Sequence, residues 1–337
     1  MICALCQERE ANKKNTHYLT DGIIRSCLNQ DGSGEREKGF YFDLSNNSAF
    51  VEFNFQRETS IPKLEESLGR IATDEEIENA KKIPFSVDYV FCSVCEDLFT
   101  SIESNFIDNI LPKFRESDLN DNVVIEIAEC KEIRLFFYLQ LWRTHICEQT
   151  LKLPVHIAES LRQIILTYET VDNDEINILP ISITYLQTLG GLEEYTTNFV
   201  GFTNDKNPYL IFMNDFIIQL FDSDEEIRFF DFHGLNSENY QEFVNQNEKE
   251  FKVKIVHNTE RKQLLNNIIK GEKVKQTLKF YTDSFNKLWF MMFGGNPPIQ
   301  ITQEYINEIT ADEFDILKYS KERIIELTRN FLMKRLK

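Results

Sequence analysis

Apolar and polar positions in the first third of the chain predict a strand, helical turns, a second strand and a long helix. Residues 50–55 alternate apolar and polar side chains with a period of two, as a half-buried strand does. Residues 62–83 predict helical turns, with Thr73 as the cap of the second. Residues 87–90 predict another strand, and the apolar positions of residues 96–114 recur with helical spacing.

The rest of the chain predicts two amphipathic helices, then a run of strands, then helices again. The first two helices cover residues 128–147 and 154–168, and the last two helical regions cover residues 260–289 and 301–336. The predicted strands between them are residues 177–186, 198–203, 209–213, 216–221, 227–232 and 251–256.

This order of elements predicts an α+β fold in which helices flank a mostly antiparallel sheet. A polar break at residues 118–122 is the predicted boundary between two domains. Residues 1–117 would form a small N-terminal domain with a long insertion, and residues 123–337 an α+β body with C-terminal helices.

Two cysteine pairs are the strongest chemical signal in this chain. Cys3 and Cys6 form one CxxC motif, and Cys92 and Cys95 form a second directly before a predicted helix. Two such turns supply four thiolates, the ligand set of a tetrahedral structural zinc ion. A knuckle, a hairpin and a helix whose first turn carries the last two ligands make up a treble clef. The alternative is two unrelated pairs of core cysteines.

Composition agrees with a metal site rather than disulfides. The chain lacks an apolar run of about 18 residues and an N-terminal secretion signal, so we expect a cytoplasmic protein with no membrane association. Cysteine pairs in a reducing compartment indicate metal binding. Cys27, Cys130 and Cys147 lie in apolar periodic contexts and are predicted to be ordinary buried thiols.

The order of motifs resembles bacterial HNH endonuclease-like proteins. The resemblance rests on the first CxxC motif, the segment of residues 13–19 around His17, and the second CxxC motif followed by Glu96. It implies that His17 is a general base that activates water, and that Glu96 binds a second metal ion such as Mg²⁺. It also implies nuclease activity, and relatives of this kind are associated with phage defence. The alternative is a zinc-stabilised sensor or adaptor that binds a partner without cutting it.

Charge is unevenly distributed along the chain. The formal net charge is −18, which disfavours indiscriminate wrapping of nucleic acid. Residues 248–279 and 318–337 nevertheless carry an excess of about five positive charges each. A basic patch for nucleic acid or an acidic protein partner is therefore expected at the C-terminal end, unless these are two solvated helix faces. The oligomeric state is not predicted.

Three other groups of residues are weaker candidates for a site. His145 with Cys147 or His156 would be a second metal site, although no acidic cluster accompanies them. Trp142 is predicted to be a core residue. Its neighbour Arg143 is expected to pair with Glu132, Glu148 or Glu159 rather than to form a site with it. The remaining candidate is a cluster of acids and one histidine at the ends of the predicted strands, comprising Asp215, Asp222, Asp231 and His233.

Overall fold

The fold combines helices with two β-sheets. The computed structural model of the chain describes residues 1–28, 40–43, 52–55, 61–80, 85–115, 119, 122–187, 199–203, 208–227, 231–237, 239–246, 249–268, 274–311 and 321–336. The helices are α1 (Asp21–Leu28), α2 (Ile61–Leu68), α3 (Asp74–Ala80), α4 (Ser93–Asn105), the π-helix η1 (Phe106–Ile110), α5 (Leu111–Arg115), α6 (Cys130–Cys147), α7 (Val155–Leu166), α8 (Asn173–Ile176), the 3-10 helices η3 (Asp224–Glu226) and η4 (Tyr240–Phe243), α9 (Asn258–Ile268), α10 (Val274–Phe293), α11 (Ile299–Thr310) and α12 (Lys321–Arg335). The strands are β1 (Thr16–His17), β2 (Phe40–Asp43), β3 (Glu52–Phe55), β4 (Ser86–Val87), β5 (Val124–Ile127), β6 (Ile181–Leu186), β7 (Phe199–Phe202), β8 (Tyr209–Met213), β9 (Phe216–Leu220), β10 (Val244–Asn245) and β11 (Phe251–Val256).

The larger sheet has the order β3-β2-β7-β8-β9-β6-β11-β5, with β10 paired to β6. The β2–β7 and β6–β11 pairs are parallel, and the other described pairs of this sheet are antiparallel. The predicted α+β class and the mostly antiparallel sheet are therefore confirmed. A separate two-stranded sheet pairs β1 with β4.

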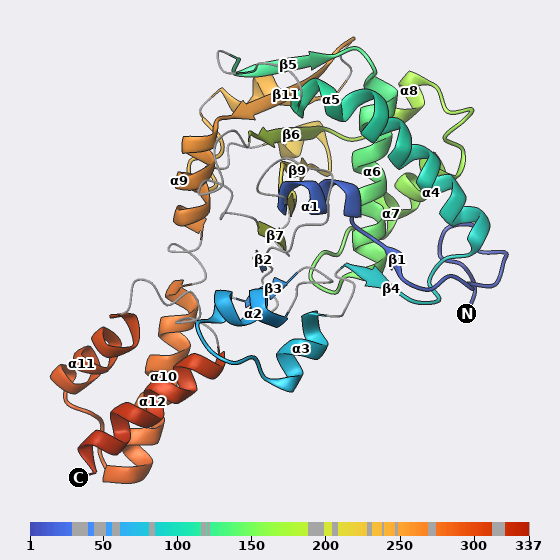
Figure 1. Ribbon diagram of the computed structural model, residues 1–337. Helices are drawn as coiled ribbons and strands as arrows, with labels where there is room; N and C mark the ends of the chain where they lie inside the picture. The colour runs from blue at the N-terminus through green and yellow to red at the C-terminus, as the bar shows by residue number, and fades with distance from the viewer. Residues whose placement is uncertain are drawn as a thin grey trace.

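The central strands are buried on both faces. In β8, Tyr209 and Ile211 face a core shared with α6 and α7, while Leu210 and Phe212 face a second core closed by α9. Alternate side chains of a strand point to opposite faces, so an apolar run supplies both cores at once. Figure 1 shows α6 and α7 on one side of the sheet and α9 on the other.

Helix α6 forms the centre of the larger core. Its side chains from Ile133 to Thr144 are all buried, which fits a helix that is apolar around most of its circumference. Trp142 is a core residue, as predicted, with its ring 6.0 Å from Phe91 and 6.4 Å from Phe99. This core contains residues of the two CxxC segments as well as the sheet. Side chains from both predicted domains therefore share this core, and the division into residues 1–117 and 123–337 stays a prediction.

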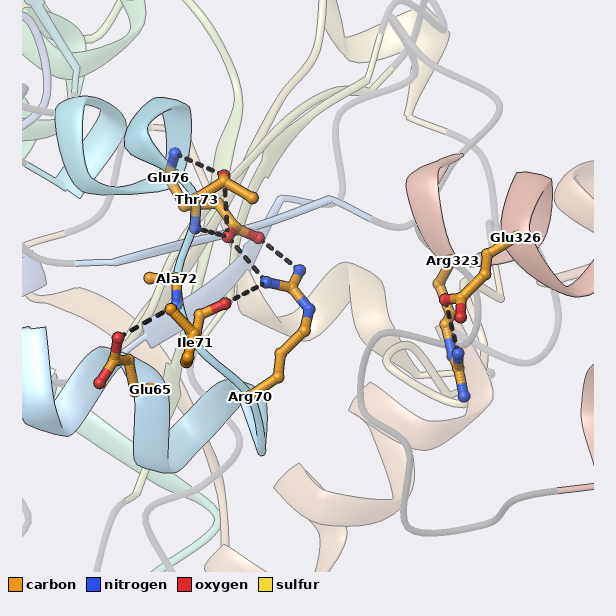
Figure 2. A network of polar contacts seen from close by, with 8 residues as sticks. All are labelled: Glu65, Arg70, Ile71, Ala72, Thr73, Glu76, Arg323 and Glu326. Carbon is orange, nitrogen blue, oxygen red and sulfur yellow. Dashed lines mark hydrogen bonds and ion pairs between the residues drawn. The ribbon is translucent and has the colours of Figure 1, made fainter.

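Helices α10, α11 and α12 form a bundle with a small core of its own. Phe285 stacks on Tyr305 with ring centroids 4.2 Å apart, and Phe331 packs against both rings. In Figure 1 this bundle projects from the body on the side of α2 and α3. Figure 2 shows Arg70, at the corner between α2 and α3, on the side that faces Arg323 and Glu326 of α12.

Three predicted strands differ from the structure. Residues 87–90 predict a strand, but only Val87 belongs to β4 (Ser86–Val87). Residues 177–186 predict one strand, but β6 begins only at Ile181, directly after Pro180, which has no N–H to donate to the sheet. The predicted strand 227–232 follows the 3-10 helix η3; its described residues 227, 231 and 232 are not in a strand, and its residues 228–230 lie outside the described residues. Strand β5 follows the polar break and pairs with β11, which its short local pattern did not predict.

Candidate metal centre

The first CxxC motif forms a tight backbone knuckle. The Gln7 N–H donates to the carbonyl of Cys3 at 3.0 Å, and the Cys3 N–H donates to the carbonyl of Arg9 at 2.8 Å. Gln7 adopts a positive φ of 57°, which turns the chain back on itself. The knuckle therefore presents both thiols to the same side.

The second CxxC motif opens helix α4. Cys92 is the N-cap residue and Cys95 lies in the first turn. The Ser93 N–H donates to Oδ1 of Asn12 at 3.0 Å, and the N–H groups of Asn12 and Lys13 donate to the carbonyl of Phe91. The Ala4 N–H also donates to the carbonyl of Val90 at 3.0 Å. These bonds join the two knuckles although 85 residues separate them in the chain.

The four sulfur atoms converge at one point. The Sγ atoms of Cys3, Cys6, Cys92 and Cys95 all lie within 4.8 Å of one another. Four thiolates about 2.3 Å from a zinc ion would be about 3.8 Å apart, so a small adjustment closes the tetrahedron. Cys3, Cys92 and Cys95 are buried, and Cys6 is half-buried. This cluster could hold a metal ion such as zinc.

Backbone N–H groups help to hold thiolates at this cluster. Burial alone would raise the pKa of the Cys6 thiol, but the N–H groups of Arg9 and Glu8 and the neighbouring thiols lower it to about 6. Burial raises the pKa values of Cys3 and Cys95. The Arg9 guanidinium interacts with Cys92, which raises the pKa of Arg9 and places a positive charge beside the sulfur atoms. A bound cation would compensate the remaining thiolates.

Arg162 of α7 braces the first knuckle from the body. Its Nη1 donates to the carbonyl of Leu5 at 2.6 Å, and its Nη2 pairs with Glu159 at 2.7 Å. The side chain of Arg162 is only 11% exposed. Sequence reasoning missed this contact because 157 residues separate the partners. The one available signal was an arginine on the otherwise apolar face of a predicted helix.

Glu96 and His17 have different surroundings. Burial raises the pKa of the Glu96 carboxyl, opposed by Arg143 and Thr16 and reinforced by Glu103, and its buried Oε2 atom has no hydrogen-bond partner among the described residues. Thr16 is buried, and adjacent side chains of a strand point to opposite faces, so His17 of β1 faces away from Thr16. His17 Nε2 lies 3.9 Å from Asp21 Oδ1, and both side chains are about one-third exposed.

A buried polar cluster lies beside Glu96, between α4 and α6. Arg143 pairs with Glu103, which also accepts from the hydroxyl of Thr20 at 2.6 Å. The Thr20 N–H donates to Oε1 of Gln140 at 3.0 Å. The predicted partners of Arg143, namely Glu132, Glu148 and Glu159, are therefore wrong, because α6 packs on α4 and brings Glu103 to the guanidinium. The cluster fastens the β1–α1 connection to the core.

The weaker candidates make structural contacts. Nδ1 of His145 accepts from the Leu153 N–H at 3.0 Å, and burial lowers the pKa of this imidazole. Burial raises the pKa of the Cys147 thiol to about 12. Asp215 is buried in ion pairs with Arg115 and Arg261, and Asp231 accepts from the Gly234 N–H. In the described part of the chain, the four-cysteine cluster is the one group of three or more Cys, His, Asp or Glu close enough to share a metal ion.

Comparison with protein families, curated proteins and solved structures finds no match to this chain. The described residues contain no helix with the length and apolar character needed to cross a membrane. The class that the fold and the cluster define is an α+β protein with four converging cysteines that could hold a metal ion.

Proposed function

We propose that the four cysteines hold one structural zinc ion in a treble-clef arrangement, and that the chain works as a zinc-stabilised binding protein. The convergence of the four Sγ atoms within 4.8 Å carries this proposal. The hairpin-like pair β1–β4, followed by α4 with Cys95 in its first turn, supports the treble-clef assignment. Four thiolates fill a tetrahedral zinc shell and leave no position for water or substrate, which is typical of structural sites.

Elemental analysis tests the zinc assignment. Freshly purified protein should contain about one zinc per chain, and Cys92→Ser should lower this content and the melting temperature together, because zinc binding contributes folding free energy. Cys130→Ser is the matched control, since Cys130 is a half-buried thiol outside the cluster that contacts the carbonyl of Lys249. Fresh protein without zinc would overturn the assignment.

The second candidate is the HNH-like nuclease, with possible substrates among phosphodiesters and a role in phage defence. The observation in its favour is His17, one-third exposed on β1 and 3.9 Å from Asp21, a carboxylate that can orient an imidazole acting as a base. In this candidate Glu96 would bind Mg²⁺. The Oε2 atom of Glu96 is buried without a hydrogen-bond partner in the described part of the chain, which suits this role. The binding protein is preferred because, among the described residues, neither Glu96 nor His17 belongs to a group of three Cys, His, Asp or Glu side chains close enough to share a metal ion.

A cleavage assay separates the two candidates. Purified protein with Mg²⁺ and plasmid DNA or RNA should show no cleavage above that of His17→Ala and Glu96→Ala. The control variant is His156→Ala, which changes an exposed histidine on α7. Cleavage that requires Mg²⁺, disappears in His17→Ala and persists in His156→Ala would reject the binding protein in favour of the nuclease.

A further inference from the structure

An apolar groove of about 520 Å³ lies between α10 and α12 on the C-terminal bundle. Tyr305, Phe285 and Leu332 belong to the bundle core and form part of its floor. The bundle closes at one end, where the hydroxyl of Tyr281 donates to the carbonyl of Lys321 at 3.3 Å. The groove walls are large apolar side chains, each between 40% and 54% exposed: Phe280, Leu288 and Met292 from α10, Ile325 and Met333 from α12, and Leu336 directly after α12.

The positions that line both walls recur with helical spacing. On α10 they follow residues 281, 285, 288 and 292; on α12 they follow residues 321, 325, 328 and 332, of which Lys321 and Thr328 are polar, and Leu336 continues the row just past the end of the helix. Spacings of three and four place these positions on one stripe of each helix. Helix α11 packs against α10 and α12 and covers one side of them. The groove has the form of an open seam between two helices, into which a further helix fits.

The charged residues of the groove are both cations. Lys321 and Arg329 line it, and no carboxylate among the described side chains does. Other cations of α12 are engaged within the molecule: Lys334 with Glu308, Arg335 with Glu304, and Arg323 with Glu326. The count of positive charges over residues 248–279 and 318–337 therefore overstates the accessible charge, and residues 248, 269–273, 318–320 and 337 lie outside the described part.

We propose that this groove binds an acidic amphipathic helix of a protein partner. The apolar face of that helix enters the seam, and its carboxylates meet Arg329 and Lys321 at the rim. The proposal rests on the proposed binding function and names its partner class and site. Met292 and Met333 in the walls suit such a partner, because flexible thioether side chains adapt to different apolar surfaces.

Charge selects this occupant over a second copy of the chain. A symmetric dimer through the groove would set the cationic rim of one copy against the same rim of the other. Like charges brought together at an interface weaken association. An acidic partner instead gains charge complementarity at the rim of an apolar contact, and the acidic remainder of this chain repels it from other surfaces.

The test uses the full chain and a synthetic helical peptide of about 18 residues, which spans roughly the length of α10. The probe carries leucines on one face and glutamates on the other, and its matched partner carries lysine in place of every glutamate. Fluorescence anisotropy at low salt should show at least about tenfold tighter binding of the acidic peptide, a preference that declines as salt rises.

Three variants locate the binding. Ile325→Glu should abolish binding of the acidic peptide, and Arg329→Glu should weaken it about tenfold and favour the basic peptide. Ile299→Glu, on α11 outside the groove and 81% exposed, should bind as the unaltered chain does. All three positions are exposed, so matching circular dichroism melts establish that each variant is folded.

The proposal is overturned if neither peptide binds, if both bind equally, or if Ile325→Glu binds as well as the unaltered chain. It is also overturned if light scattering shows a dimer that Ile325→Glu converts to a monomer, because a second copy then occupies the groove. If the protein contains zinc and shows no cleavage, but does not bind the acidic peptide, the groove proposal is rejected and the proposed function is retained. Nuclease activity dependent on His17 rejects the proposed function and leaves the peptide result to decide the groove.

Discussion

At the scale of single residues, Asp215 is a buried charge held by two arginines. It occupies the β8–β9 turn, is 1% exposed, and bonds Arg115 at 2.6 Å and Arg261 at 3.3 Å. Arg261 also donates to the carbonyl of Leu186, and Asn214 donates to that of Ile24. The turn thereby fastens α1, α5 and α9 to the sheet. Asp215 was a candidate site residue only because it follows a predicted strand, and its contacts give it a structural role.

Asp215→Ala should lower the free energy of unfolding by about 3–5 kcal/mol, because it leaves two arginines, one of them fully buried, without their carboxylate. Urea denaturation at neutral pH measures the loss. The control is Asp224→Ala, which removes an exposed acid in η3 and should change the free energy of unfolding by no more than about 0.5 kcal/mol. A loss below about 1 kcal/mol in Asp215→Ala would show that the ion pairs are not an anchor.

At the scale of elements, the corner between α2 and α3 is held by one carboxylate. Glu76 accepts from the Thr73 N–H at 2.8 Å and forms a two-pronged pair with Arg70 at 2.7 and 3.0 Å, while Thr73 accepts from the Glu76 N–H (Figure 2). This is a capping box with an added arginine. The sequence predicted the Thr73 cap, and the structure adds Arg70 as its outer partner.

Stability at this corner should depend on pH. The Arg70 guanidinium lowers the pKa of Glu76 below its ordinary value of 4.5. A carboxyl whose pKa is lower in the folded state stabilises that state above its unfolded pKa, and the effect disappears as pH falls through the folded pKa. Glu76→Gln should therefore cost about 1 kcal/mol at pH 7 and progressively less below pH 4.5.

Denaturation of both proteins at several pH values checks this. Glu75→Gln is the control, since Glu75 is exposed in the same first turn of α3. Equal costs of Glu76→Gln at pH 7 and near pH 4 would contradict an electrostatic origin. The same cost in Glu75→Gln would assign the effect to the helix dipole rather than to the Arg70 pair.

At the scale of the whole molecule, the four-cysteine cluster belongs to the main core, and the C-terminal bundle does not. Residues around the cluster share one core with α6, α7 and the sheet, whereas α10, α11 and α12 have their own. The Arg162 contact to Leu5 links α7 to the first knuckle. Removal of a metal ion from this cluster should therefore destabilise the body and leave the bundle unaffected.

Hydrogen exchange with and without a zinc chelator measures this. Chelation should lower the protection of amides in α4 and α7 at least about tenfold, equivalent to about 1.4 kcal/mol, and leave α10 and α12 unchanged. Chelation in the presence of excess zinc is the control and should restore protection. Loss confined to residues near Cys3 and Cys6 would show that the cluster does not support the body.

The sequence by itself determined the features that depend on local periodicity and on residue chemistry. Strands β8 and β11 coincide with their predicted ranges, and α6 and α7 differ from theirs by one or two residues, because a strand or helix repeats its pattern within a few residues. The two cysteine pairs were recognisable for the same reason, since each CxxC turn brings two thiols together locally, whereas the meeting of the two pairs is set by the tertiary structure.

Only the tertiary structure decided which remote segments meet. Glu103 became the partner of Arg143, and Leu5 that of Arg162, because packing of whole helices sets which polar groups are buried together. The antiparallel pairing of β1 with β4, which places Thr16 opposite Val87, is also specified by no local pattern. The groove likewise depends on how three helices pack, since the same stripes of lining residues would be buried in a closed bundle. Local sequence encodes the period of an element, whereas burial and pairing arise from the free energy of the whole chain.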